Sequence, residues 1–333
     1  MSKNLFGVCI ALGSVLVAAC ASNEPSLEAG SSDCVGSKCD VWGTDNRREL
    51  YEAPQEVVSR FAYSIGSLYD SRKLTAFEED GGFIGVASPL KLGARFGLCL
   101  DQRFFHQSSD AHCTGFLISP TVFATAGHCL SRSTSPGGEE ECARLSIVFE
   151  HAYFEQPEQP DAQLVVDPLS VHRCKRVLAL RNQPREGIDY ALIELDRPAE
   201  GYRKPLDFRR QGAPEVGEEL VAIGAPTGLP LKYTDGQVIE LPEWGMRAPV
   251  IVSNIDAFGG NSGGPLINAT TGVVDGILSF NSGKKYVPRP LPDGSSCGEL
   301  AVCGENTECL IPLAASNIAH FADVFEAAVA GNL

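Results

Sequence analysis

Three short segments of the chain carry side chains that could perform nucleophilic chemistry. They hold His128 in Thr-Ala-Gly-His-Cys, Asp189 in Ile-Asp-Tyr and Ser262 in Gly-Gly-Asn-Ser-Gly-Gly. A serine hydroxyl is a weak nucleophile at neutral pH and needs an imidazole to take its proton. The imidazole needs a carboxylate on its other nitrogen, which fixes the tautomer and stabilises the imidazolium. The pattern predicts acyl transfer, with Ser262 as nucleophile, His128 as general base and then acid, and Asp189 as orienting carboxylate.

Each segment alone also has an ordinary structural interpretation. His128 could be a packed polar residue near a disulfide, Asp189 a carboxylate at the start of a strand, and the glycines around Ser262 a surface turn. Glycines also permit a tight turn that aims backbone N–H groups at one point. Because the three segments lie far apart in the chain, only tertiary folding can bring them together.

The elements that would position them are short strands. From residue 41 onward, apolar runs alternate with Gly and Pro turns, for example at 115–118, 122–124, 145–149, 190–195, 220–223 and 276–280. Short strands at this spacing favour a β-sandwich or β-barrels. Only the C-terminal end, at 316–330, has clear helical spacing, with Ser316 or Asn317 as its cap.

The three motifs in His-Asp-Ser order resemble those of the chymotrypsin-fold, trypsin-like (S1 family) serine peptidases. The Gly-Asn-Ser-Gly form is similar to the bacterial secreted branch, as are residues 43–48 and 228–232. The resemblance covers about 42–330. It implies an all-β fold of two six-stranded antiparallel Greek-key β-barrels, at about 55–200 and 201–315, with a C-terminal helix. It also implies an endopeptidase that acts on polypeptides through an acyl-enzyme and needs no metal or organic cofactor.

The same resemblance assigns further roles near the nucleophile. The N–H groups of Gly260 and Ser262 would form the oxyanion hole. Cys113 and Cys129 match the disulfide that flanks the family's histidine. Cys142 and Cys174 could form a second bridge. The sequence gives no connectivity for Cys99, Cys297, Cys303 and Cys309, and the last three have no neighbouring histidine for a zinc site.

Specificity depends on residues that the resemblance assigns to substrate binding. The segment 276–283 resembles the strand that pairs with the substrate backbone, and Phe280 would bind substrate there. Ser279 would lie behind Asp189, and Asn281 would form the wall of the primary pocket. Asp256 matches the pocket-floor carboxylate of Arg- and Lys-specific enzymes; the alternative, which we favour slightly, is a carboxylate that only hydrogen-bonds the loop. Leu278 stands where glutamyl-specific relatives carry histidine, which argues against preference for glutamate.

The alternatives to a peptidase are a catalytically inactive binding module on the same fold, an esterase, and a structural envelope lipoprotein. An esterase would normally carry a Gly-x-Ser-x-Gly elbow with the serine before the histidine, and that order is absent.

The residue before Ser262 is the neutral Asn261. An inserted N-terminal ammonium would find no counter-charge there, so we expect activity without a freed N-terminus.

The N-terminus has the pattern of an export signal. Lys3 precedes an uncharged run at 5–19, which is too short to span a bilayer. The small residues before Cys20 resemble a lipobox, so we expect 1–19 to be a signal peptide, Cys20 to be lipidated and 20–41 to be a flexible tether. An ordinary signal peptide is the alternative. The predicted location is the bacterial cell envelope, or outside the cell.

Composition limits the class of protein. The chain has 333 residues, 44% of them hydrophobic, with 42 acidic and 27 basic side chains, for a net charge of −15. Such acidity argues against nucleic-acid binding, which needs a basic face. Twelve cysteines favour an oxidising compartment. We expect a monomer that contacts membranes only through a lipid on Cys20.

Overall fold

The computed structural model describes residues 40–77, 82–87, 89–131, 137–160, 162–242, 250–280, 285–303 and 313–333. Cys20, the predicted signal peptide, Asn281 and Cys309 lie outside these ranges. No helix within them is long and apolar enough to cross a membrane.

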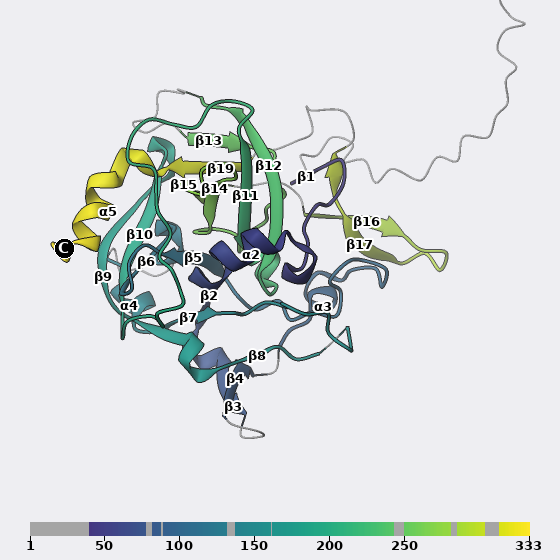
Figure 1. Ribbon diagram of the computed structural model, residues 1–333. Helices are drawn as coiled ribbons and strands as arrows, with labels where there is room; N and C mark the ends of the chain where they lie inside the picture. Colours follow the sequence, from purple (N-terminus) through teal and green to yellow (C-terminus); the bar gives the residue numbers. More distant parts are fainter. Residues whose placement is uncertain are drawn as a thin grey trace, which may run out of the picture. The chain divides into compact units, whose positions relative to one another are not determined.

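Six strands close the first barrel, in the order β10-β6-β5-β2-β7-β9 (Figure 1). Every neighbouring pair is antiparallel. Most of their side chains are buried, and the strands are rich in the β-branched and aromatic residues that favour sheets. The strands are β2 (Ile65–Asp70), β5 (Cys113–Leu117), β6 (Val122–Thr125), β7 (Leu145–Phe149), β9 (Val171–Gln183) and β10 (Ile188–Leu195).

One glycine shows how tightly this barrel is packed. Gly115 of β5 pairs with Thr125 of β6, and a Cβ on Gly115 would lie only 2.2 Å from the ring of Phe123. A larger residue would push the two strands apart. The close approach of β5 and β6 matters because the segment that carries His128 directly follows β6.

The second barrel has the same strand number and closure, in the order β11-β12-β13-β19-β15-β14. The expectation of two six-stranded antiparallel barrels is therefore confirmed. Its core is a separate cluster that includes Leu220, Ile251 and Leu266. The strands are β11 (Glu219–Gly224), β12 (Lys232–Glu240), β13 (Val250–Ser253), β14 (Pro265–Asn268), β15 (Val274–Phe280) and β19 (Leu313–Asn317).

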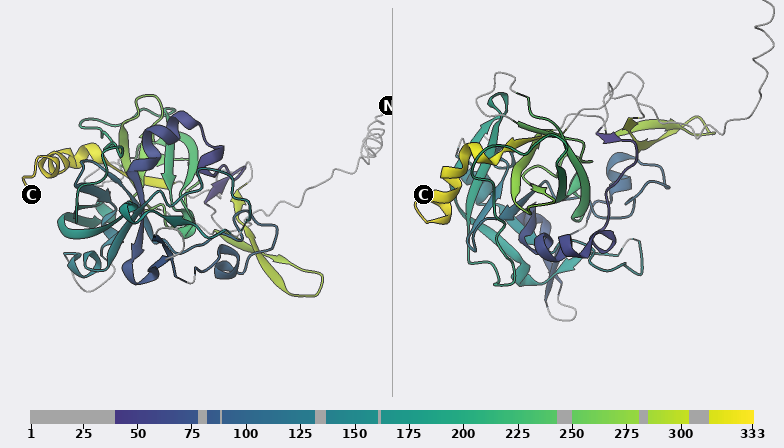
Figure 2. Two further views of the ribbon diagram at one scale, coloured as in Figure 1. Left: turned by 60° about the horizontal axis from the view of Figure 1, so that its bottom comes forward. Right: turned by 45° about the horizontal axis from the view of Figure 1, so that its top comes forward.

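The C-terminal helix returns to the first barrel. It begins as a 3₁₀ turn at Ile318–Phe321 and continues as α5 (Ala322–Val329), after the Asn317 side chain accepts a bond from the Ala319 N–H at 3.1 Å. Asn317 is thus the cap, and Ser316 belongs to β19. Phe321 stacks on Tyr190 of β10 at 4.5 Å between ring centroids. Figures 1 and 2 show α5 across the outside of this barrel, beside β9 and β10.

Several small elements surround the barrels, and no sequence pattern predicted them. Three helices are too short for a periodic pattern: α2 (Gln55–Phe61), α3 (Leu92–Phe96) and α4 (Glu139–Cys142). A hairpin of β16 (Tyr286–Pro290) and β17 (Ser296–Leu300) extends away from the barrels (Figure 2). The others are β1 (Val41–Trp42) paired with β18 (Val302–Cys303), and a sheet of β3 (Leu74–Phe77), β4 (Phe83–Val86) and β8 (Val165–Val166).

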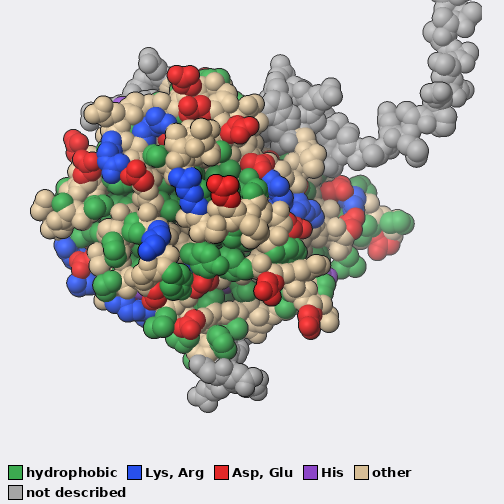
Figure 3. Space-filling view, in the orientation of Figure 1, with side chains coloured by type: hydrophobic (Ala, Val, Ile, Leu, Met, Phe, Trp, Pro, Cys, Tyr) green, Lys and Arg blue, Asp and Glu red, His purple; other side chains and the backbone are tan. Residues whose placement is uncertain are grey.

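Charges of both signs are interspersed on the face that carries α2 (Figure 3). Apolar side chains lie between them. Charges of opposite sign at close spacing largely cancel at a distance. This face therefore presents no continuous field of one sign.

Candidate active site

His128 and Asp189 are joined by two hydrogen bonds. His128 lies on a single 3₁₀ turn (Gly127–Cys129) after β6, and Asp189 is the second residue of β10. The His128 Nδ1 lies 2.6 Å from Asp189 Oδ2, and the His128 backbone N–H donates to Oδ1 at 2.9 Å. The Asp189 side chain is 1% exposed and that of His128 34%. A buried carboxylate on Nδ1 fixes the proton there and leaves Nε2 to act on the cleft.

The backbone of Asp189 is held in place from the second barrel. The backbone N–H of Asp189 donates to Ser316 Oγ of β19 at 3.1 Å. The hydroxyl oxygen of Ser279, in β15, lies 3.5 Å from the carbonyl oxygen of Asp189. The same hydroxyl donates a hydrogen bond to the carbonyl of Ile277 at 2.9 Å. Ser279 is thus behind Asp189, as the family resemblance implied. Ser316 was recognised only as a helix cap, because no local pattern indicates a contact 127 residues away.

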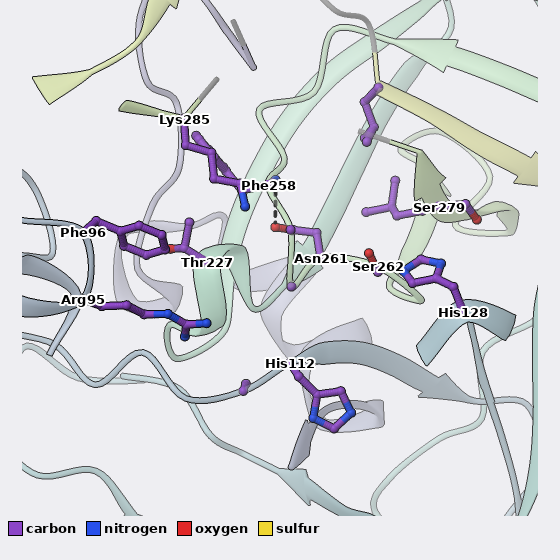
Figure 4. A pocket seen from close by; sticks show the side chains of 15 residues that line it. Arg95, Phe96, His112, His128, Thr227, Phe258, Asn261, Ser262, Ser279 and Lys285 are labelled. Carbon is purple, nitrogen blue, oxygen red and sulfur yellow. Dashed lines mark hydrogen bonds between the residues drawn. The ribbon is translucent and has the colours of Figure 1, made fainter. Parts of the chain in front are cut away.

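Ser262 follows a tight turn in the loop between β13 and β14. The Asn261 N–H donates to Phe258 O at 2.9 Å, and the Gly264 N–H donates to Asn261 O at 2.8 Å. Ser262 and His128 line the same pocket, of about 380 Å³. Figure 4 shows the Ser262 side chain next to the imidazole. The structure therefore brings the three predicted residues into one place.

The peptide between Gly259 and Gly260 is oriented by a neighbouring loop. The Gly259 carbonyl accepts a bond from the Thr227 N–H at 2.8 Å, and the Gly260 carbonyl accepts one from Thr114 Oγ1 at 2.7 Å. In a planar trans peptide the C=O and N–H point in opposite directions, so the Gly260 N–H points away from Thr227. Within the described ranges, neither this N–H nor that of Ser262 donates to another protein group. Both remain available to a bound oxygen.

Gly260 also requires the absence of a side chain. Its φ is +112°, and a Cβ would lie 2.2 Å from the carbonyl oxygen of Ala225. Backbone of this kind is essentially restricted to glycine. The sequence motif with its paired glycines is therefore explained by the turn that aims these N–H groups.

Asp256 does not line the pocket, in contrast to the pocket-floor role that the sequence suggested. Its side chain is buried, and Oδ2 accepts the backbone N–H of Asn46 at 2.8 Å. The loop-stabilising alternative fits this contact. Of the other residues assigned to substrate binding, Ser279 lines the pocket and Phe280 ends β15, whereas Asn281 lies outside the described residues.

The part of the pocket lining that the structure describes is cationic. Arg95 and Lys285 lie along one side of it (Figure 4), and its described residues include no Asp or Glu. The Lys285 Nζ lies 2.8 Å from where a Cβ on Gly259 would stand. Burial lowers the pKa of Lys285; nearby Arg95 lowers it further and Asp40 acts in the opposite direction. No sequence pattern indicated that Arg95 and Lys285 would lie in one pocket, because they come from distant segments.

Three disulfides join the described segments. Cys113–Cys129 has the predicted pairing and ties β5 to the turn that carries His128. Cys142–Cys174 is the second bridge that the sequence suggested. Cys99–Cys297 joins the segment after α3 to β17, a pairing that the sequence left open. The first and the third of these disulfides cross-link backbone near the pocket.

Comparison with known proteins gives a consistent fold. Residues 113–277 match the family model described as trypsin-like peptidase domain. No curated protein matches the chain. A mutant of human heparin binding protein is 16% identical, with a TM-score of 0.50, over 87% of this chain and 97% of that one.

Two further solved structures are similar at lower scores. The serine endoprotease from Yersinia pestis is 15% identical, with a TM-score of 0.44, over 84% of this chain and 68% of that one. A Glu endopeptidase in complex with MPD is 16% identical, with a TM-score of 0.46, over 87% and 99%. From the family match and the two closed barrels, we conclude that the chain carries a trypsin-like peptidase domain with the chymotrypsin fold.

Proposed function

We propose that the protein is a serine endopeptidase that cleaves polypeptides through an acyl-enzyme on Ser262. The observation that carries the proposal is the hydrogen-bonded pair of His128 and Asp189 beside Ser262 in one pocket. An isolated serine would lack a base, and a histidine without the carboxylate would lack a fixed tautomer. Together they form a complete route for a proton.

The chemistry follows from these positions. Ser262 Oγ attacks the substrate carbonyl as its proton passes to His128 Nε2. The negative oxygen that develops receives the N–H groups of Gly260 and Ser262. The C–N bond then breaks, and His128 returns the proton to the leaving amine. Water repeats the sequence on the acyl-enzyme and releases the acid. Asp189 stabilises the imidazolium throughout.

The test is covalent labelling of the full chain by a fluorophosphonate. We expect one adduct, on the peptide that contains Ser262, and cleavage of a mixed peptide library. Ser262→Ala should lose both without unfolding. Ser59→Ala, in an exposed position of α2, is the matched control and should keep both. A wild-type chain that neither labels nor cleaves would instead support the inactive binding module.

We propose separately that a lipid on Cys20 anchors the protein to the cell envelope. The support is the sequence that precedes Cys20, and the net charge of −15 disfavours attraction of the chain to anionic lipid. Cys20→Ser should move the protein from the membrane fraction to the soluble fraction. An unchanged membrane fraction would contradict the anchor.

A further inference from the structure

The segment 45–49, which precedes the first barrel, is bound along strand β12 of the second barrel. The backbones of Arg48 and Tyr233 exchange hydrogen bonds of 2.8 and 2.9 Å. Asn46 Nδ2 donates to the carbonyl of Asp235 at 2.6 Å. Glu49 forms an ion pair of 2.9 Å with Lys232, and both side chains are almost wholly buried. Contacts on both sides of Arg47 therefore fix its position.

Arg47 is a buried cation with its own counter-charge. It is only 2% exposed, and its guanidinium donates to both carboxylate oxygens of Asp45, at 2.8 and 2.9 Å. Arg103 adds a second contact with Asp45 at 3.3 Å. Burial alone would raise the pKa of Asp45, but the two arginines outweigh it and hold the pKa below the usual value. The pair is thus ionised and compensated inside the protein.

This segment contacts the loop that leads to Ser262. The Arg47 guanidinium lies 4.2 Å from the ring centroid of Phe258, within the range of a cation–π interaction. The adjacent N–H of Asn46 donates to the Asp256 carboxylate. Phe258 is linked to Asn261 by two bonds, since its N–H donates to Asn261 Oδ1 at 3.2 Å and its carbonyl accepts the Asn261 N–H. Asn261 lies between the two N–H groups that would hold the oxyanion.

We propose that Arg47 is a positioning residue that acts through Phe258 to hold loop 256–262 in the conformation that presents the N–H groups of Gly260 and Ser262 to the substrate oxygen. This inference rests on the proposed peptidase function. The cation belongs to the chain itself and is in place once the protein folds. The site is therefore assembled without a cleavage that frees a new N-terminus, and the neutral Asn261 needs no ammonium partner.

The first test compares Arg47→Met with Arg48→Gln in the full chain. Arg48 is the matched control because it is the adjacent arginine and its side chain pairs with Asp235 rather than with the loop. For Arg47→Met we expect kcat and the rate of fluorophosphonate labelling to fall about 100-fold, the size of effect of one lost oxyanion donor. KM should change less than about threefold, and a peptide boronate should bind more weakly in proportion to kcat. Arg48→Gln should keep the wild-type values.

Arg47→Lys and Phe258→Leu sharpen the result. Lysine restores the charge without the planar stack, so it should recover part of kcat. Phe258→Leu keeps the apolar volume but removes the ring, so it should repeat the selective loss of kcat even where Arg47→Met fails to fold. Full kcat and full labelling in Arg47→Met, or in Phe258→Leu if the former is unfolded, would overturn the proposal.

The second test asks whether a freed N-terminus is needed. The chain is made with an uncleavable N-terminal fusion and its intactness is confirmed by mass. We expect wild-type turnover. Turnover that appears only after an engineered cut would overturn the proposal while leaving the peptidase function intact. If the fluorophosphonate labels neither the fused chain nor the cut chain, the proposed peptidase function itself is contradicted.

Discussion

The two barrels contribute to the site in different ways. In the first barrel, His128 and Asp189 bind each other directly, and a disulfide beside His128 fixes the turn that carries it. In the second barrel, the loop that ends in Ser262 is held by groups from elsewhere in the chain: Thr114, Thr227 and the segment 45–49. The base half is therefore formed within one barrel, with Ser316 as its support from the other, whereas the nucleophile half depends on contacts from several distant segments. Substitutions far from Ser262 should affect its loop more than they affect the histidine.

The largest effect is expected from the proton route itself. His128→Ala should lower kcat by about 10⁶-fold, and the double variant with Ser262→Ala should be hardly worse than either single one, because residues that act as a unit are not additive. Steady-state cleavage of a peptide substrate measures both. Additive losses would show that the two halves of the site work independently.

Asp189→Asn tests the contact between His128 and Asp189 within the first barrel. An amide in place of the carboxylate favours the wrong imidazole tautomer, so kcat should fall by about 10⁴-fold while the fold persists. Circular dichroism and turnover are measured together. Asp293→Asn, in the exposed turn of the β16–β17 hairpin, is the control and should leave turnover unchanged. A fall of tenfold or less in Asp189→Asn would mean that other groups orient the ring.

Thr114→Val tests whether the loop that carries Ser262 depends on a contact from the first barrel. Valine keeps the shape but removes the hydroxyl that donates to Gly260 O and accepts the Ala225 N–H. One buried hydrogen-bond partner left unpaired costs about 1–3 kcal/mol. We expect kcat to fall about tenfold with little change in KM. Thr121→Val, before β6, should change neither, and equal effects in both variants would contradict the coupling between barrels.

The smallest expected effect concerns substrate choice. Because Arg95 and Lys285 line the pocket while Asp256 is occupied by Asn46, we expect acidic residues to be enriched, and basic residues depleted, around the cut sites in a peptide library. A partly exposed ion pair is worth about 1 kcal/mol, so Lys285→Gln should reduce that enrichment about fivefold. Lys175→Gln, paired with Glu194 on the outer surface, is the control. Enrichment of basic residues would instead restore Asp256 as the determinant.

The sequence predicted the parts of the molecule whose signals are local. The barrels follow from short strands, and the three motifs are each contiguous, so His128, Asp189 and Ser262 could be identified before folding was known. Their mutual arrangement agrees with that prediction, while their catalytic roles remain a proposal. The pairing of Cys113 with Cys129 came from the family resemblance and is confirmed.

The rest depends on contacts between distant segments. Arg47 and Arg48 are identical in type, and only the fold separates a buried cation against Phe258 from a half-exposed one against Tyr233. Asp256 had two interpretations because nothing nearby in the chain indicates that the Asn46 N–H is its partner. Cys99 and Cys297 lie 198 residues apart, so their pairing carries no spacing signal.

The position of Ser316 has a consequence for the order in which the protein is made. Strand β19 fills the place between β13 and β15, and its Ser316 holds the backbone of Asp189 in the other barrel. Strand β19 comes after all the other described strands of the two barrels in the chain. A nascent or truncated chain that stops before 313 lacks one wall of the second barrel and the support behind Asp189. In the proposed peptidase, the site is therefore completed only after Ser316 has been added, although His128, Asp189 and Ser262 are all synthesised earlier.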